Sequence, residues 1–176
     1  ARREASTVFL AKVFNWMAIG LALTGAIAFL TANTGLARAI VATPLFFILI
    51  LAELGLVFYL SARIEKIQPA TATGLFVGYA VLNGLTLSAI FLAYTTASIA
   101  GTFFITAGMF GAMAVYGLVT KRDLSGMGSF LFMGLIGIIL ASVVNIFLKS
   151  TNLYWAISMI GVLVFVGLTA WDVQKI

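Results

Sequence analysis

Residues 40–62 read IVATPLFFILILAELGLVFYLSA, an apolar run in which Glu53 is the only charged residue. A helix needs about 20 apolar residues to cross the roughly 30 Å hydrocarbon core of a bilayer, so this stretch predicts a transmembrane helix. Glu53 lies near its middle. A carboxylate at that depth is costly unless it is protonated, paired or hydrated, and it tends to mark a pathway or a switch.

Five further apolar runs of similar length predict spans over residues 12–32, 70–93, 98–119, 128–148 and 153–173. Hydrophobic residues make up 63% of the chain and charged residues 9%, which excludes an ordinary soluble protein. The alternating segments of about 10 residues that build a membrane β-barrel do not occur. We therefore predict an all-α integral membrane protein, a polytopic helical bundle whose six helices form a single transmembrane domain over residues 1–176.

The basic residues predict the orientation of this bundle. Short cytoplasmic loops of membrane proteins carry an excess of Lys and Arg. Only Arg38 and Lys149 fall on one side of the predicted bundle, whereas eight basic residues fall on the other: Arg2, Arg3, Lys12, Arg63, Lys66, Lys121, Arg122 and Lys175. The N-terminus is therefore predicted to be cytoplasmic. Because these charges lie at helix ends, the net charge of +5 indicates a bilayer as partner and no nucleic acid.

The chain contains no cysteine and no histidine. Disulfides, thiolate nucleophiles, the usual zinc sites and His-dependent catalysis are thereby excluded. We expect no enzymatic activity and no cofactor, and any response to pH near neutrality has to come from carboxylates.

Glu53 and Asp172 are the only acids inside or at the edge of the predicted spans. Glu53 has an alternative interpretation as a protonated side chain that bonds a neighbouring helix and stabilises the bundle. Asp172 lies at the end of the last span, where it can face the lipid headgroups or pair with Lys175 three residues later. For Asp172 the functional and structural interpretations are equally supported.

Three uncharged polar residues within the spans are candidates for lining a cavity: Asn83, Thr86 and Asn145. Asn83 precedes Gly84, and this pair is expected to loosen the helix and free backbone carbonyls. The alternative interpretation is that all three side chains bond across helices and hold the bundle together.

Several segments together resemble the bacterial branch of the Bax-inhibitor family, also called the transmembrane Bax inhibitor motif family. They are residues 83–88 (NGLTLS), residues 116–125 (YGLVTKRDLS), residues 168–176 (LTAWDVQKI) and Glu53 within residues 52–55 (AELG). The similarity extends in order along essentially the whole chain. It implies a bacterial inner-membrane bundle of six helices around a central seventh, which would follow Ile176 and is not among these 176 residues.

The resemblance also implies functions for particular residues. Family members are associated with a pH-sensitive calcium leak, and some bacterial ones with restraining a membrane-anchored quality-control protease. The acid matching Asp172 shares a proton with a second Asp on the last helix, which is not among these residues, and acts as a pH sensor. A basic latch is expected near the end of the second span, where Arg63 is the candidate.

We therefore expect a calcium or other cation leak, with Glu53 as a cation site in mid-membrane and Asp172 as the sensor. Calcium prefers oxygen ligands, so both carboxylates are candidates for transient calcium binding. The rival hypothesis is a membrane regulator that binds a protease through its helix surfaces and needs no interior acid.

Overall fold

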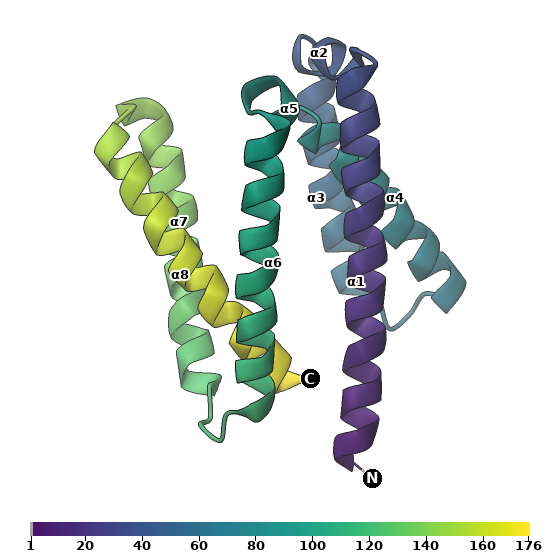
Figure 1. The fold of residues 1–176 in the computed structure, drawn as a ribbon, viewed down its shortest axis with the longest axis vertical. Helices are drawn as coiled ribbons and strands as arrows, with labels where there is room; N and C mark the ends of the chain where they lie inside the picture. Colours follow the sequence, from purple (N-terminus) through teal and green to yellow (C-terminus); the bar gives the residue numbers. More distant parts are fainter. Residues whose placement is uncertain (1) are drawn as a thin grey trace. The chain divides into compact units, whose positions relative to one another are not determined.

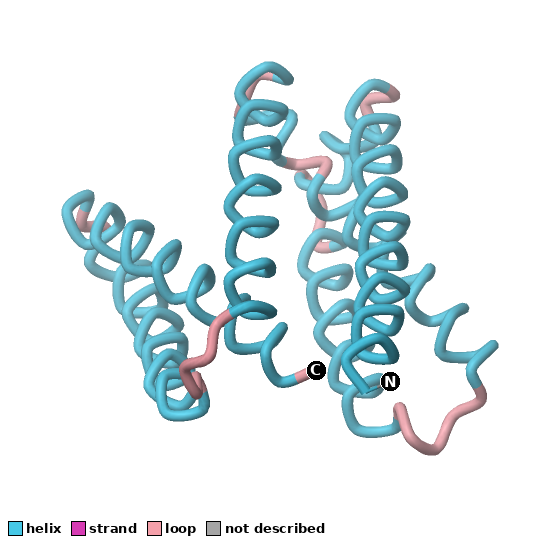
Figure 2. Tube along the Cα trace, turned by 60° about the horizontal axis from the view of Figure 1, so that its bottom comes forward, coloured by secondary structure: helices cyan, strands magenta, loops and turns pink. Residues whose placement is uncertain are grey.

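The computed structural model describes the backbone of residues 2–176 and the side chains of residues 6–176. Eight helices account for almost all of this part of the chain. Figures 1 and 2 show the course of the chain through these helices and their connecting loops. In order they are α1 (Arg2–Asn33), α2 (Leu36–Val41), α3 (Leu45–Arg63), α4 (Pro69–Leu87), α5 (Ile90–Ala93), α6 (Thr96–Val119), α7 (Ser125–Leu148) and α8 (Thr151–Lys175). The prediction of an all-α protein is confirmed.

Six segments are long and apolar enough to cross a membrane, as predicted. They are Ser6–Asn33, Leu45–Arg63, Pro69–Ala93, Thr96–Val119, Ser125–Leu148 and Thr151–Lys175. Each overlaps one predicted span closely. The apolar length of a span is a local property of the sequence, which explains the agreement.

The second span begins later than predicted. Residues 40 and 41 belong to the short helix α2, and the spanning helix α3 starts only at Leu45, after Pro44. Proline lacks a backbone N–H and disfavours helical geometry in the residue before it, so it separates the two helices. Gly35 precedes α2 with a φ of 76°, a left-handed conformation that glycine adopts without steric cost.

The third span is interrupted at Ser88 and Ala89, between α4 and α5. The helix was expected to loosen at Asn83 and Gly84, but α4 continues through both residues. Ser88 is fully buried, and its hydroxyl donates to the carbonyl of Leu85 at 2.6 Å. This local bond competes with regular helical geometry at the point where α4 ends.

The helices pack as two compact units, Ala1–Ala100 and Gly101–Ile176. In the first unit α4 packs against both α1 and α3. Gly84 lets α4 approach α1 closely, because a Cβ there would lie 2.6 Å from Ile27 Cβ and 2.8 Å from the Thr24 carbonyl oxygen. The Thr24 hydroxyl donates to the Ala80 carbonyl at 2.8 Å and ties the same two helices together.

In the second unit α7 packs against α8. Gly128 lies directly against the indole of Trp171, with no room for a Cβ. Gly117, near the end of α6, lies in the same way against the backbone of Ala170. Glycines at these two positions therefore hold the last turns of α8 close to α6 and α7.

The basic residues keep their one-sided distribution within each unit. In the first, α2 with Arg38 lies at the opposite end from Arg63 at the end of α3 (Figure 1). In the second, the α7–α8 turn with Lys149 lies at the opposite end from the α6–α7 loop with its two basic residues. The cytoplasmic N-terminus remains a prediction from this distribution.

Candidate functional site

Glu53 lies midway along α3, on the side of the helix that packs against the rest of its unit. The half-buried residues of α3 recur at helical spacing and form one stripe with Glu53, namely Phe46, Leu49, Ile50, Leu56 and Leu60. Val57, four residues after Glu53, is 39% exposed and lies beside this stripe. The carboxylate therefore faces another helix of its own unit.

The partner of Glu53 is Thr86 on α4, one of the polar residues that the sequence had singled out. The Thr86 hydroxyl forms a hydrogen bond with Glu53 Oε1, and it also lies 3.2 Å from the Leu82 carbonyl oxygen. No basic side chain pairs with Glu53 among the described residues. A neutral hydroxyl is thus the polar group that the structure assigns to this intramembrane carboxylate.

The single proton of the Thr86 hydroxyl gives the contact two arrangements. An ionised Glu53 can only accept, so Thr86 must donate to it. A protonated Glu53 can donate to Thr86, which is then free to donate to the Leu82 carbonyl. The α3–α4 contact therefore accommodates both protonation states with the same heavy atoms.

Asn83 lies one turn before Thr86 on α4 and faces a different helix. It lines a groove of about 240 Å³ between α1 and α4. The other lining residues are mostly apolar: Met17, Gly20, Leu21, Thr24, Phe76, Tyr79, Ala80 and Leu87. Asn83 is half-buried there and makes no hydrogen bond among the described residues.

Asn145 is engaged in the turn between α7 and α8. Its side-chain oxygen accepts from the backbone N–H of Ser150 at 2.9 Å, and its backbone carbonyl accepts from Lys149 at 2.8 Å. Lys149 takes a left-handed conformation with a φ of 49°, which ends α7. These bonds are local to the turn, whereas the structural interpretation from the sequence had the side chain bonding across helices.

Asp172 lies in the last turn of α8 and is exposed. It makes no hydrogen bond or ion pair among residues 6–176. Lys175, the candidate partner from sequence spacing, instead places its Nζ over the ring of Trp171, 5.0 Å from the centroid. Arg63, the candidate latch, is the exposed last residue of α3. Glu53 and Arg63 belong to the first unit and Asp172 to the second.

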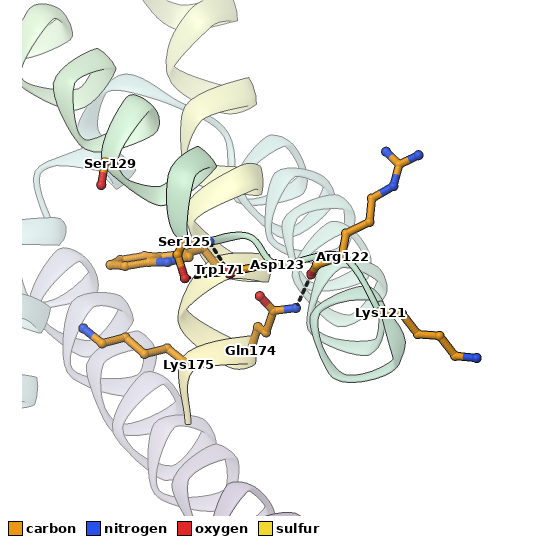
Figure 3. Close-up of a pocket in the computed structure, with 8 residues that line it drawn as sticks. All are labelled: Lys121, Arg122, Asp123, Ser125, Ser129, Trp171, Gln174 and Lys175. Carbon is orange, nitrogen blue, oxygen red and sulfur yellow. Dashed lines mark hydrogen bonds between the residues drawn. The ribbon is translucent and has the colours of Figure 1, made fainter.

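A groove of about 580 Å³ lies beside the end of α8, and we call it the basic groove (Figure 3). It is lined by Lys121, Arg122, Asp123, Ser125, Ser129, Trp171, Gln174 and Lys175. The sequence analysis used most of these residues, but only for orientation or for the family resemblance, and it did not single out Ser129. A run of basic and small polar residues between two predicted spans was the available signal.

Gln174 joins the end of α8 to the α6–α7 loop. Its side-chain N–H donates to the Arg122 carbonyl at 2.7 Å, and its side-chain oxygen accepts from the Leu124 N–H at 2.9 Å. In the same loop Asp123 accepts from the hydroxyl of Ser125 at 2.6 Å and from its backbone N–H at 2.9 Å. The pKa of Asp123 lies below its ordinary value because both bonds favour the ionised carboxylate. The bond from the Ser125 hydroxyl contributes most, and the bond from its backbone N–H contributes less.

Comparison with known proteins assigns the chain to one family, whose model matches nearly all of it. The family described as "Inhibitor of apoptosis-promoting Bax1" matches residues 6–176. The inner membrane protein YbhL of Escherichia coli K12 is 53% identical over 176 residues, which cover 99% of this chain and 75% of that protein. Uncharacterized proteins of Borreliella burgdorferi and Deinococcus radiodurans are 49% and 48% identical and match 96% of this chain. No solved structure matches significantly.

Proposed function

The chain belongs to the Bax-inhibitor family and is a multi-pass protein of the inner membrane, and from this premise we propose that it is a pH-sensitive calcium leak channel. In this proposal, protonation of an intramembrane carboxylate gates the leak. We further propose that the protein acts without an enzymatic reaction or a bound cofactor, since the chain offers no histidine or cysteine.

One observation carries the proposal: Glu53 lies in the middle of a spanning helix and faces a neutral hydroxyl. An ion pair would favour the ionised acid, whereas a hydroxyl can form a hydrogen bond with the ionised or the protonated carboxyl group. Ionised Glu53 offers carboxylate oxygens, the ligand type that calcium prefers, at the depth where a permeating cation has lost most of its water. Protonated Glu53 offers no charge and leaves the barrier in place.

Asp172 has the role of sensor in this scheme, and Arg63 that of latch. Asp172 is exposed at the end of α8 and is not held by a counter-charge among the described residues. It is therefore the acid at this end of the bundle that we assign to the role of sensor. Arg63 has a long side chain at the end of α3 and supplies a mobile positive charge that an ionised acid would attract.

The test is calcium uptake into liposomes that contain the purified protein, followed from pH 6 to pH 8. We expect a flux that depends on pH, that Glu53→Gln abolishes, and that Asp172→Asn makes insensitive to pH. Glu65→Gln is the matched control, because Glu65 is an exposed acid just beyond the end of α3. It removes one negative charge from outside the spans and should leave the flux unchanged.

Flux no higher than in empty liposomes would reject the channel. The alternative function, a regulator that binds a membrane-anchored quality-control protease, would then take its place. It makes a distinct prediction, because binding through helix surfaces should survive both Glu53→Gln and Asp172→Asn.

A further inference from the structure

The basic groove combines an excess of positive charge with a fixed framework at the end of three spanning helices. Three of its lining residues are cationic and one is anionic, which leaves a formal charge of +2 from 3 − 1. All of its residues belong to the second unit, Gly101–Ile176. Neither Glu53 nor Asp172, the proposed gating acids, is among them.

The positive charges of the groove are not neutralised by the protein. The side chains of Lys121 and Arg122 extend outward from the loop, and neither makes a hydrogen bond or ion pair among the described residues (Figure 3). The one acid, Asp123, is exposed and already accepts two bonds from Ser125. Lys175 extends on the other side of α8 and contacts only the ring face of Trp171.

The framework beneath these charges is well fixed. Gln174 holds the backbone on both sides of Asp123 through two hydrogen bonds. Trp171 is seated on Gly128, so the indole forms a wall whose position is set by helix packing. Ser129, one turn into α7, contributes an exposed hydroxyl that bonds no other described residue. The loop therefore presents its cations from a rigid base.

We propose that the basic groove binds the phosphate of an anionic phospholipid headgroup. Its place at the ends of α6, α7 and α8 puts it at headgroup depth, where lipid phosphates are the most abundant anions. Tryptophan is favoured at this depth, and basic pockets between spanning helices are suited to anionic headgroups. Arg122 and Lys121 extend from the loop on the same side of α8 (Figure 3), where the guanidinium supplies the planar donor geometry that fits phosphate and Lys121 supplies a point charge.

The test uses Trp171 as a reporter inside the groove. Trp16→Phe and Trp155→Phe leave it as the only tryptophan, since the chain has three. The protein is placed in phosphatidylcholine vesicles that carry a fixed fraction of phosphatidylcholine with a nitroxide on its headgroup, which quenches nearby indoles. Unlabelled phosphatidylglycerol then replaces unlabelled phosphatidylcholine stepwise. A headgroup that occupies the groove displaces the quencher, and Trp171 fluorescence recovers.

We expect the groove to prefer phosphatidylglycerol over phosphatidylcholine by roughly fivefold for each cationic residue that contacts the headgroup. Lys121→Gln with Arg122→Gln should remove most of this preference. The matched control, Arg38→Gln with Lys149→Gln, removes the same charge from residues that the sequence predicts on the other side of the membrane, and it should leave the preference intact. Native mass spectrometry gives an independent check on the protein with all three tryptophans. The number of phosphatidylglycerol molecules that it retains should fall in the Lys121→Gln, Arg122→Gln variant and stay unchanged in the control variant.

Three results would overturn the proposal. The first is equal quenching in both lipids. The second is an equal loss of preference in the two double variants, which would mean that only net charge matters. The third is equal recovery when soluble glycerol 3-phosphate is added to phosphatidylcholine vesicles, which would identify a site for free phosphate compounds.

Discussion

Replacing Thr86 by valine tests the contact on which the proposed gating rests. Valine has nearly the shape of threonine, so Thr86→Val removes the bond to Glu53 with little change in packing. Hydrogen bonds between membrane helices contribute about 0.6 kcal/mol on average and up to about 1.7 kcal/mol. If Glu53 is ionised, the loss rises to about 1.5–3 kcal/mol, the range for bonds to charged groups.

A double-mutant cycle isolates this bond from the other effects of each substitution. Thr86→Val, Glu53→Met and the double variant are unfolded reversibly in mixed detergent micelles, and the coupling is the departure from additivity. We expect a coupling of about 0.6–1.7 kcal/mol. We also expect calcium flux to change with Thr86→Val.

Thr24→Val provides the matched control for this cycle. Thr24 also bonds α4, but through the Ala80 carbonyl at 2.8 Å and from α1. Thr24→Val should lower the free energy of unfolding by a similar amount and leave the flux unchanged. Its effect and that of Glu53→Met on the free energy of unfolding should be additive within about 0.3–0.5 kcal/mol. Coupling of Glu53 to Thr86 no larger than its coupling to Thr24 would refute the assignment of Thr86 as its partner.

Three further predictions concern the second unit. Gly128→Ala should lower the free energy of unfolding by about 1–3 kcal/mol because its Cβ meets the α8 indole, whereas Gly126→Ala, with open space around it, should not. Gln174→Ala should lower the free energy of unfolding by about 1–3 kcal/mol, because it removes two hydrogen bonds to the α6–α7 loop. Gln174→Glu keeps only the bond that the side chain accepts, so it should lower the free energy of unfolding by about half as much. The lowered pKa of Asp123 stabilises the start of α7 above pH of about 4, and this contribution is lost as the pH falls through the folded-state pKa. The protection of the Ser125 amide, taken relative to its intrinsic exchange rate at each pH, should therefore fall in acid, and Asp123→Asn should remove that dependence.

The spans were predictable because their signal is local. A run of apolar residues predicts a spanning helix whatever it packs against, and Pro44 already marks the late start of α3. The break after α4 was not predictable in the same way. Asn83 and Gly84 carry the stronger local signal for a break, but packing of Gly84 against α1 keeps that turn helical, and the break falls at the buried Ser88.

The candidate site shows the same difference between features that the local sequence encodes and contacts that depend on helix packing. Glu53 stands out in the sequence because its charge contradicts its surroundings, but its pairing with Thr86 depends on how α3 and α4 align, which no local pattern encodes. Lys175 shows the reverse case. Its spacing of three residues from Asp172 predicts an ion pair, yet it lies over Trp171, whose ring is fixed by contact with Gly128.

The choice of threonine as the partner of Glu53 bears on how pH can act on this protein. An arginine or lysine partner would lose most of its attraction when the acid is protonated, and the helices would separate. With Thr86 the hydrogen bond persists in both states and only its direction reverses, while the Leu82 carbonyl gains or loses a proton donor. Protonation of Glu53 therefore changes the charge in the middle of the span without breaking the α3–α4 contact. In the proposed channel this change of charge acts on the electrostatic barrier to a cation, and the α3–α4 contact stays in place.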